Sequence, residues 1–113
     1  GPVDGKIEVN AWGFGFTTTR FTGIVETLLV SSATPIEADQ TELWFAFTVR
    51  DIGKGITGGV GKAFIAEIER QFEQDIPIWE NKIHLARPYL CDGDGPIVQF
   101  RNWATQFYAD APL

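Results

Sequence analysis

The sequence predicts an α+β fold, in which an antiparallel sheet of about three strands is followed by a long helix and a shorter C-terminal helix. Two patterns lead to this prediction. Residues alternate between two faces with a period of two in the first half of the chain, whereas apolar residues recur at three- and four-residue steps in the second half. The links between the alternating stretches are too short for the crossover that parallel strands need, so the strands should pair antiparallel.

The strands are predicted at residues 6–16, 19–31 and 41–50. In the first strand Ile7, Val9 and Ala11 share one face, which is the pattern of a half-buried strand. Gly13 and Gly15 interrupt the end of this strand and predict a bulge or a close approach of the backbone.

Two glycine-containing segments resemble ligand loops in composition but not in spacing. Residues 51–61 are rich in glycine, yet Gly61-Lys62 is followed by Ala63, so the GxxxxGK(S/T) phosphate loop is not matched. We interpret this segment as a flexible lead-in to the long helix. Residues 92–95, Asp-Gly-Asp-Gly, lack the later ligands of a calcium loop and predict a tight turn.

The long helix is predicted over residues 61–85, and its apolar stripe contains one acid. The stripe is formed by Phe64, Ile65, Ile68, Phe72, Ile76, Trp79 and Ile83. Asp75 lies three residues after Phe72 and four before Trp79, so its carboxylate should point where the apolar side chains point. An ionised carboxylate that faces a core is costly unless a partner compensates it. Pro77 removes a helix hydrogen bond and should kink the helix beside Asp75.

Asp75 has two interpretations from these residues alone. A neighbouring Arg, Lys or backbone group could satisfy it at the edge of the stripe, or it could serve as a metal ligand or a general acid or base. His84 follows it by nine residues, which in one straight helix places the two side chains on opposite sides. Cys91 has no second histidine available as a base, so we expect no nucleophilic role for it.

The C-terminal part of the chain should hold the second helix. Arg87-Pro88 ends the pattern of the long helix. Pro96 is predicted at the first position of the final helix, where its missing N–H costs nothing.

Composition excludes several classes of function. At 113 residues the chain is one domain at most. Its formal net charge of -6 argues against nucleic acid as a partner, and its single cysteine excludes an internal disulfide. No run is apolar enough to span a membrane, and we expect a cytoplasmic protein. The chain contains no Met, so we expect a piece of a longer polypeptide, with a tag remnant in residues 1–5.

The segment from Phe72 to Tyr108 resembles the C-terminal part of the catalytic domain in Rieske non-heme iron oxygenases. In the branch of the 3-ketosteroid 9α-hydroxylase oxygenase components and the cholesterol 7-desaturases, a helix of the pattern QDxxIWxNK precedes PxL, DGP and RxWxxQFY. The matching residues are Gln74-Asp75, Ile78-Trp79, Asn81-Lys82, Pro88, Leu90-Cys91, Asp94-Gly95-Pro96, Arg101, Trp103 and Gln106-Phe107-Tyr108. Residues 19–37, which include Thr34-Pro35, resemble the strand pair that precedes this helix.

The resemblance implies a helix-grip fold related to START domains, in which a curved antiparallel sheet surrounds a long helix and encloses an apolar cavity. It implies a mononuclear Fe(II) held by two His and one carboxylate, with Asp75 as the third ligand by motif match. Electrons would come from a Rieske 2Fe-2S cluster, typically across a subunit boundary in a trimer, and from a reductase before it. The implied substrates are steroids or sterols, which are hydroxylated or desaturated with O₂. Residues expected to line the substrate cavity are Phe14, Phe16, Trp44, Phe45, Phe47, Phe72 and Trp79.

Departures from the family pattern limit what the chain can do alone. The two iron-binding His and the Cys₂His₂ set of the Rieske cluster cannot be assembled from His84 and Cys91. We therefore expect residues 1–113 to be a single domain fragment that by itself holds no cofactor and has no oxygenase activity. Two alternatives stay open, namely a non-enzymatic lipid- or steroid-binding helix-grip module and a structural oligomerisation domain.

Overall fold

A computed structural model describes residues 4–23, 25–50 and 59–109 of the chain. Most of the predicted tag remnant and of the predicted glycine-rich lead-in therefore lies outside the described residues. The chain divides into two compact units, residues 1–80 and 81–113, and each is described by itself.

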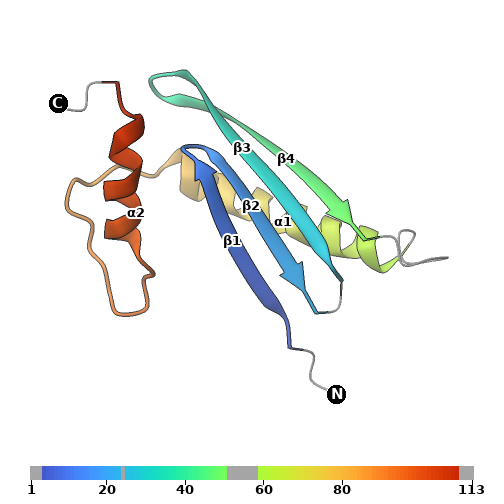
Figure 1. Cartoon of the computed structure of the whole chain (residues 1–113). Coiled ribbons are helices and arrows are strands. Elements are labelled where there is room, and N and C mark those ends of the chain that lie inside the picture. Colours follow the sequence, from blue (N-terminus) through green and yellow to red (C-terminus); the bar gives the residue numbers. More distant parts are fainter. Residues whose placement is uncertain (1–3, 24, 51–58, 110–113) are drawn as a thin grey trace. The chain divides into compact units, whose positions relative to one another are not determined.

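The first unit contains a four-stranded antiparallel sheet whose strands follow the order of the chain (Figure 1). The strands are β1 (Lys6–Gly13), β2 (Phe16–Thr22), β3 (Thr27–Glu37) and β4 (Gln40–Val49), and each pairs with the next. One long helix, α1 (Val60–Glu80), follows them. The predicted α+β class and the antiparallel pairing are thus confirmed, with four strands where about three were expected.

The extra strand arises because the stretch predicted as one strand, residues 19–31, is two strands joined at Gly23. Gly23 has a φ of +125°, and a Cβ atom there would lie 3.1 Å from the Cα of Gly5. A residue with a side chain would be strained in this conformation and would crowd the backbone of Gly5, just before β1. The β-branched and aromatic residues on both sides of Gly23 hid this turn in the sequence pattern.

The turn between β1 and β2 confirms the prediction made from its glycines. The pairing of β1 with β2 shifts register between Ala11 and Gly13, which is a β-bulge. At Gly15, φ is +86° and an added Cβ would lie 2.5 Å from the carbonyl oxygen of Ala33. The backbone N–H of Ala33 donates to the carbonyl oxygen of Gly15 at 2.7 Å, so the turn is held against β3.

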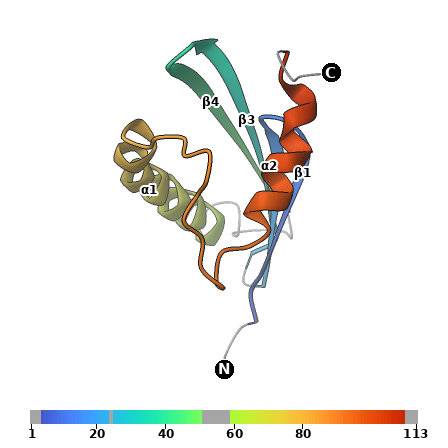
Figure 2. The same cartoon turned by 90° about the vertical axis from the view of Figure 1, so that its left-hand side faces the viewer.

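Helix α1 runs along one side of the sheet, which Figure 2 shows in side view. The rings of Phe21 on β2 and Phe64 on α1 meet edge to face at 5.4 Å between centroids, and those of Phe45 on β4 and Phe72 on α1 stack at 4.3 Å. Since Phe21 and Phe45 mark the side of the sheet toward α1, we call it the α1-facing side and the other the outer side. Leu29 of β3, which is 4% exposed, lies under α1 at the centre of the core.

Helix α1 ends at Glu80, five residues before the predicted end at Leu85. Pro77 lies inside the helix and does not end it. Ile83, the last residue of the predicted stripe, lies outside α1 and is 78% exposed. His84 consequently lies outside α1, and the prediction of its orientation relative to Asp75 in one straight helix does not apply.

One ion pair on α1 gives a testable pH dependence. Hydrogen bonds donated by the Arg70 guanidinium at 2.9 and 2.6 Å, and by Gln71 at 3.0 Å, lower the pKa of Glu67 from 4.5 to about 2. A lowered carboxyl pKa stabilises the folded state above the pKa of the unfolded chain, and this gain is lost as the pH falls toward about 2. Because the pair is exposed, we expect only a slightly higher melting temperature for the wild type than for Glu67→Gln at pH 6. In thermal melts, this difference should shrink below pH 4.5 and in high salt.

The second unit contains α2 (Ile97–Ala104), which continues into a short 3-10 helix, η1 (Thr105–Phe107). Pro96 precedes the first helical residue, one position earlier than predicted. The predicted turn at residues 92–95 is present, since the N–H of Cys91 donates to the Asp94 carboxylate at 2.7 Å and the N–H of Asp94 donates back to the carbonyl of Cys91 at 3.0 Å. Arg101 donates to the carbonyl oxygen of Leu85 at 2.5 Å and ties α2 to the start of this unit. Among the described helices, none is long and apolar enough to cross a membrane.

Candidate functional site

Asp75 lies on the sheet-facing stripe of α1, as the sequence pattern predicts. It is half-buried, whereas its neighbours Glu73 and Gln74 are exposed. Phe72, three residues before it, stacks on Phe45, and the Phe72 and Trp79 rings lie 6.2 Å apart between centroids. Helical geometry therefore places the carboxylate beside two aromatic rings of the same stripe.

Within the described part of the chain, the Asp75 carboxylate has no hydrogen-bond or ion-pair partner. The ion pairs found there join other residues, namely Lys6 to Glu8, Arg50 to Glu26 and Arg70 to Glu67. The interpretation in which a neighbouring Arg or Lys satisfies Asp75 is thus not realised among these residues. A half-buried carboxylate without a partner in an apolar stripe is energetically unfavourable unless something else compensates its charge.

The sheet beside this part of α1 carries short side chains. Ala11 pairs with Thr17, Thr17 with Ser31, and Ser31 with Phe45, so these four residues form one rung on the α1-facing side. Three of the four side chains in this rung are small. Large side chains fill the rungs nearer the start of α1 instead, where Leu29 pairs with Phe47.

The described residues do not by themselves complete a metal site. They contain no cluster of three or more His, Cys, Asp or Glu side chains that could hold a metal ion. His84 and Cys91 are exposed and belong to the second unit. A metal ion at Asp75 would therefore need further ligands from outside the described residues.

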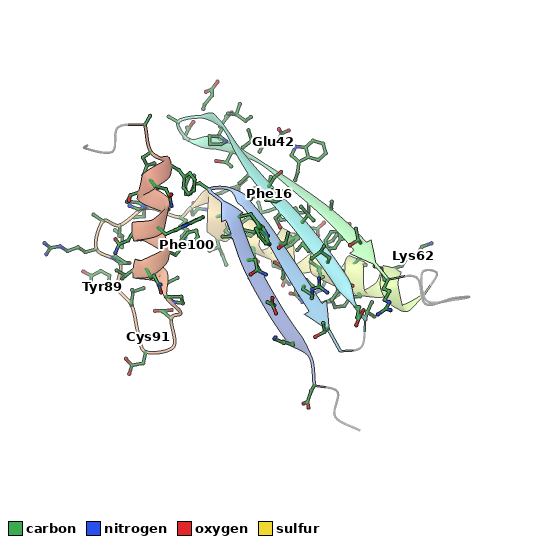
Figure 3. The ribbon with its side chains drawn as sticks, in the orientation of Figure 1. Phe16, Glu42, Lys62, Tyr89, Cys91 and Phe100 are labelled. Atoms are coloured by element: carbon green, nitrogen blue, oxygen red, sulfur yellow. The ribbon has the colours of Figure 1, made fainter. Side chains whose placement is uncertain are left out.

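The aromatic residues predicted to line a substrate cavity fall into two groups. Phe45, Phe47, Phe72 and Trp79 lie at the interface between α1 and the sheet, together with Asp75. Phe16 and Trp44 share a rung on the outer side, through their common partner Ser32, and are 44% and 64% exposed. Figure 3 shows Phe16 on that side of the sheet. Phe14 lies in the turn between β1 and β2 and is exposed. The structure thus brings Phe45, Phe72 and Trp79 together on the part of α1 that carries Asp75, whereas Phe47 lies one rung nearer the start of α1.

Two pockets open at the ends of the interface between α1 and the sheet. One has a volume of about 720 Å³ and lies between the β3–β4 hairpin and the last turns of α1, where Leu43, Ile76 and Trp79 line it. The other, of about 450 Å³, lies at the start of α1 between the helix and β1–β2. Ile7, Val25 and Ala63 line the second pocket and were not predicted as site residues, because only the tertiary fold brings β1 and α1 together.

Comparison with protein families identifies the relatives of this arrangement. Residues 4–108 match the model of the 3-ketosteroid 9alpha-hydroxylase C-terminal domain. The chain belongs to this family. The match includes the whole segment from Phe72 to Tyr108, on which the resemblance to this branch of Rieske oxygenases was based, and confirms it.

Individual members of the 3-ketosteroid 9alpha-hydroxylase family are similar over most of the chain. Two oxygenase components of 3-ketosteroid-9-alpha-monooxygenase from Rhodococcus rhodochrous are 33% and 36% identical over 89 and 90 residues. Each alignment covers 76% of this chain but 23% of the relative, so the chain spans about a quarter of the relatives' length. A cholesterol 7-desaturase from Caenorhabditis elegans is 43% identical over 49 residues, which is 43% of this chain and 11% of the relative. No solved structure matches the chain.

Proposed function

We propose that this chain is the C-terminal part of the catalytic domain of a Rieske-type non-heme iron oxygenase, and that Asp75 is the carboxylate ligand of its mononuclear Fe(II). The two histidine ligands and the Rieske 2Fe-2S cluster would come from the remainder of the polypeptide. The observation that carries this proposal is the position of Asp75, half-buried in the apolar stripe of α1 without a partner among the described residues.

A bound cation explains this position better than a purely structural role does. A metal ion is the largest local charge in its site and compensates a carboxylate that would otherwise be costly in apolar surroundings. Two histidines and one carboxylate are the ligand set of non-heme Fe(II) oxygenases, which leaves coordination positions open for O₂. The short side chains of Ala11, Thr17 and Ser31 support the proposal, because they leave little bulk in the rung of Phe45, whose ring stacks on Phe72 one helical turn before Asp75.

The substrate class follows from the relatives and from the apolar surroundings of Asp75. The relatives are named as 3-ketosteroid monooxygenase components and as a cholesterol desaturase. We propose a steroid or sterol as the substrate and hydroxylation or desaturation as the reaction. The relatives are oxygenase components, so we also propose a reductase as the electron donor and a homo-oligomeric parent protein.

The proposal predicts a sharp difference between this chain and the polypeptide from which it derives. The 113-residue chain should bind less than stoichiometric Fe(II) and should not oxidise steroids, since one carboxylate does not make an iron site. The full polypeptide, supplied with a reductase, reduced nicotinamide and O₂, should convert a 3-keto steroid or a sterol into an oxidised product. Metal analysis and mass spectrometry of the products measure both results. Stoichiometric iron with turnover by the 113-residue chain would contradict the proposal, as would a full polypeptide that oxidises no steroid or sterol.

A further inference from the structure

The pocket at the start of α1 is lined mostly by apolar side chains. It has a volume of about 450 Å³, and the described residues that line it are Gly5, Lys6, Ile7, Phe21, Thr22, Val25, Ala63 and Phe64. The side chains of its inner wall are packed against one another, because the rings of Phe21 and Phe64 meet edge to face and Val25 is 7% exposed. We call it the α1-start pocket.

The two polar side chains in this lining have partners of their own. The Thr22 hydroxyl donates to the carbonyl oxygen of Lys6 at 3.5 Å. The Lys6 ammonium lies 3.2 Å from the Glu8 carboxylate, with which it forms an ion pair. The remaining side chains are hydrocarbon. A keto or hydroxyl oxygen of a ligand would give up its hydrogen bonds to water in this pocket and would gain no side-chain hydrogen bond in return. Burial of such an unsatisfied polar group is unfavourable for binding.

The α1-start pocket lies at a fixed distance from Asp75 along the helix. Phe64 and Asp75 are eleven residues apart on α1, which is about 16 Å at a rise of about 1.5 Å per residue. Between these levels the α1-facing side of β1 presents Ile7, Val9 and Ala11, the partners of Phe21, Thr19 and Thr17. Ile7 and Val9 are 65% and 62% exposed within the described residues, so α1 itself does not cover this apolar row.

We infer that the α1-start pocket receives the hydrocarbon end of an elongated substrate whose reacting carbon lies near Asp75. The inference rests on the function proposed above and makes it more specific. A rigid ring system along the exposed row of β1 would span the distance between the two places. The lining then selects sterols that keep a branched alkyl side chain over steroids that carry a keto oxygen at that end.

Metal-free binding to the 113-residue chain tests the inference separately from the iron site. Equilibrium dialysis would compare a labelled 3-keto sterol that has its alkyl side chain with the matched steroid that has a keto oxygen in its place. We expect the sterol to bind about tenfold more tightly or better, since a hydrophobic pocket discriminates by about 10–200-fold for one methylene group. Ala63→Phe should abolish the preference by filling the pocket. Ala66→Phe, one turn along α1 and outside the lining, is the matched control and should keep it.

A second variant, Ile7→Asn, tests the pocket even if the Ala63→Phe protein does not fold. Ile7→Asn places an amide in the lining at an exposed strand position and should also reduce the preference at least severalfold, with circular dichroism confirming the fold. Equal affinity for the two ligands, absence of saturable binding, or the same loss in Ala66→Phe would overturn the inference. Asp75→Asn should leave the preference unchanged. A full polypeptide that loses iron on this substitution, combined with no sterol preference, would leave the proposed function standing and refute the pocket assignment alone.

Discussion

Replacement of Asp75 by Asn in the full polypeptide should remove iron and steroid turnover together. Asn keeps the shape of Asp and can still occupy the half-buried position on α1, but it carries no negative charge to hold the cation. Loss of partners that merely orient metal ligands costs about 10–100-fold in affinity or activity, so the loss of a ligand itself should cost about 100-fold or more. Metal analysis of the purified variant and its rate of steroid oxidation measure the two effects.

Glu73→Gln is the matched control for this substitution. Glu73 lies on the same helix two residues earlier and is exposed, and the change removes the same charge. It should leave the iron content and the rate within about twofold of the wild type, since an exposed charge is screened by solvent. A purely structural Asp75 would give a different pattern, in which Asp75→Asn changes the melting temperature while the iron content stays stoichiometric.

Replacement of Leu29 by Ala should cause the largest loss of stability of any single truncation in the first unit. Leu29 is 4% exposed on β3, between Thr19 of β2 and Phe47 of β4 and beneath α1. Truncation of a buried Leu removes its apolar burial and leaves a cavity, which together lower the free energy of unfolding by about 2–5 kcal/mol. Urea unfolding followed by circular dichroism measures this change.

The same truncation at Leu43 provides the comparison for Leu29. Leu43 lies on β4, on the same side of the sheet, but is 43% exposed. Its replacement should lower the free energy of unfolding by less than half as much, because less apolar surface returns to water. Equal losses at the two positions would mean that the core is not centred beneath α1.

Helical periodicity alone was sufficient to find both α1 and its exceptional acid. The stripe from Phe64 to Trp79 faces the sheet, and the carboxylate of Asp75 lies within it, as the three- and four-residue spacings predict. The pattern could not show whether the Asp75 carboxylate has a hydrogen-bond or ion-pair partner. That distinction depends on which cations the fold brings near Asp75, and the fold places the arginines of the ion pairs elsewhere.

The number of strands and the α1-start pocket could not be predicted correctly from the sequence. A run of strand-forming residues on both sides of Gly23 masked a turn that requires positive φ. The pocket combines Ile7 from β1 with Ala63 from α1, and no local pattern links residues so distant in the chain. The helix end also differed from the prediction, since the spacing of Ile83 continues the stripe although α1 ends at Glu80.

Anomalous diffraction at the iron absorption edge, from crystals of the full polypeptide, tests the role of Asp75 most directly. We expect an iron peak within coordination distance of an Asp75 carboxylate oxygen, with two histidine nitrogens completing the protein ligands. This peak should disappear in the Asp75→Asn protein. A mononuclear iron held by other residues, with Asp75 paired to an Arg or Lys of the upstream chain, would contradict the role of Asp75 as an iron ligand.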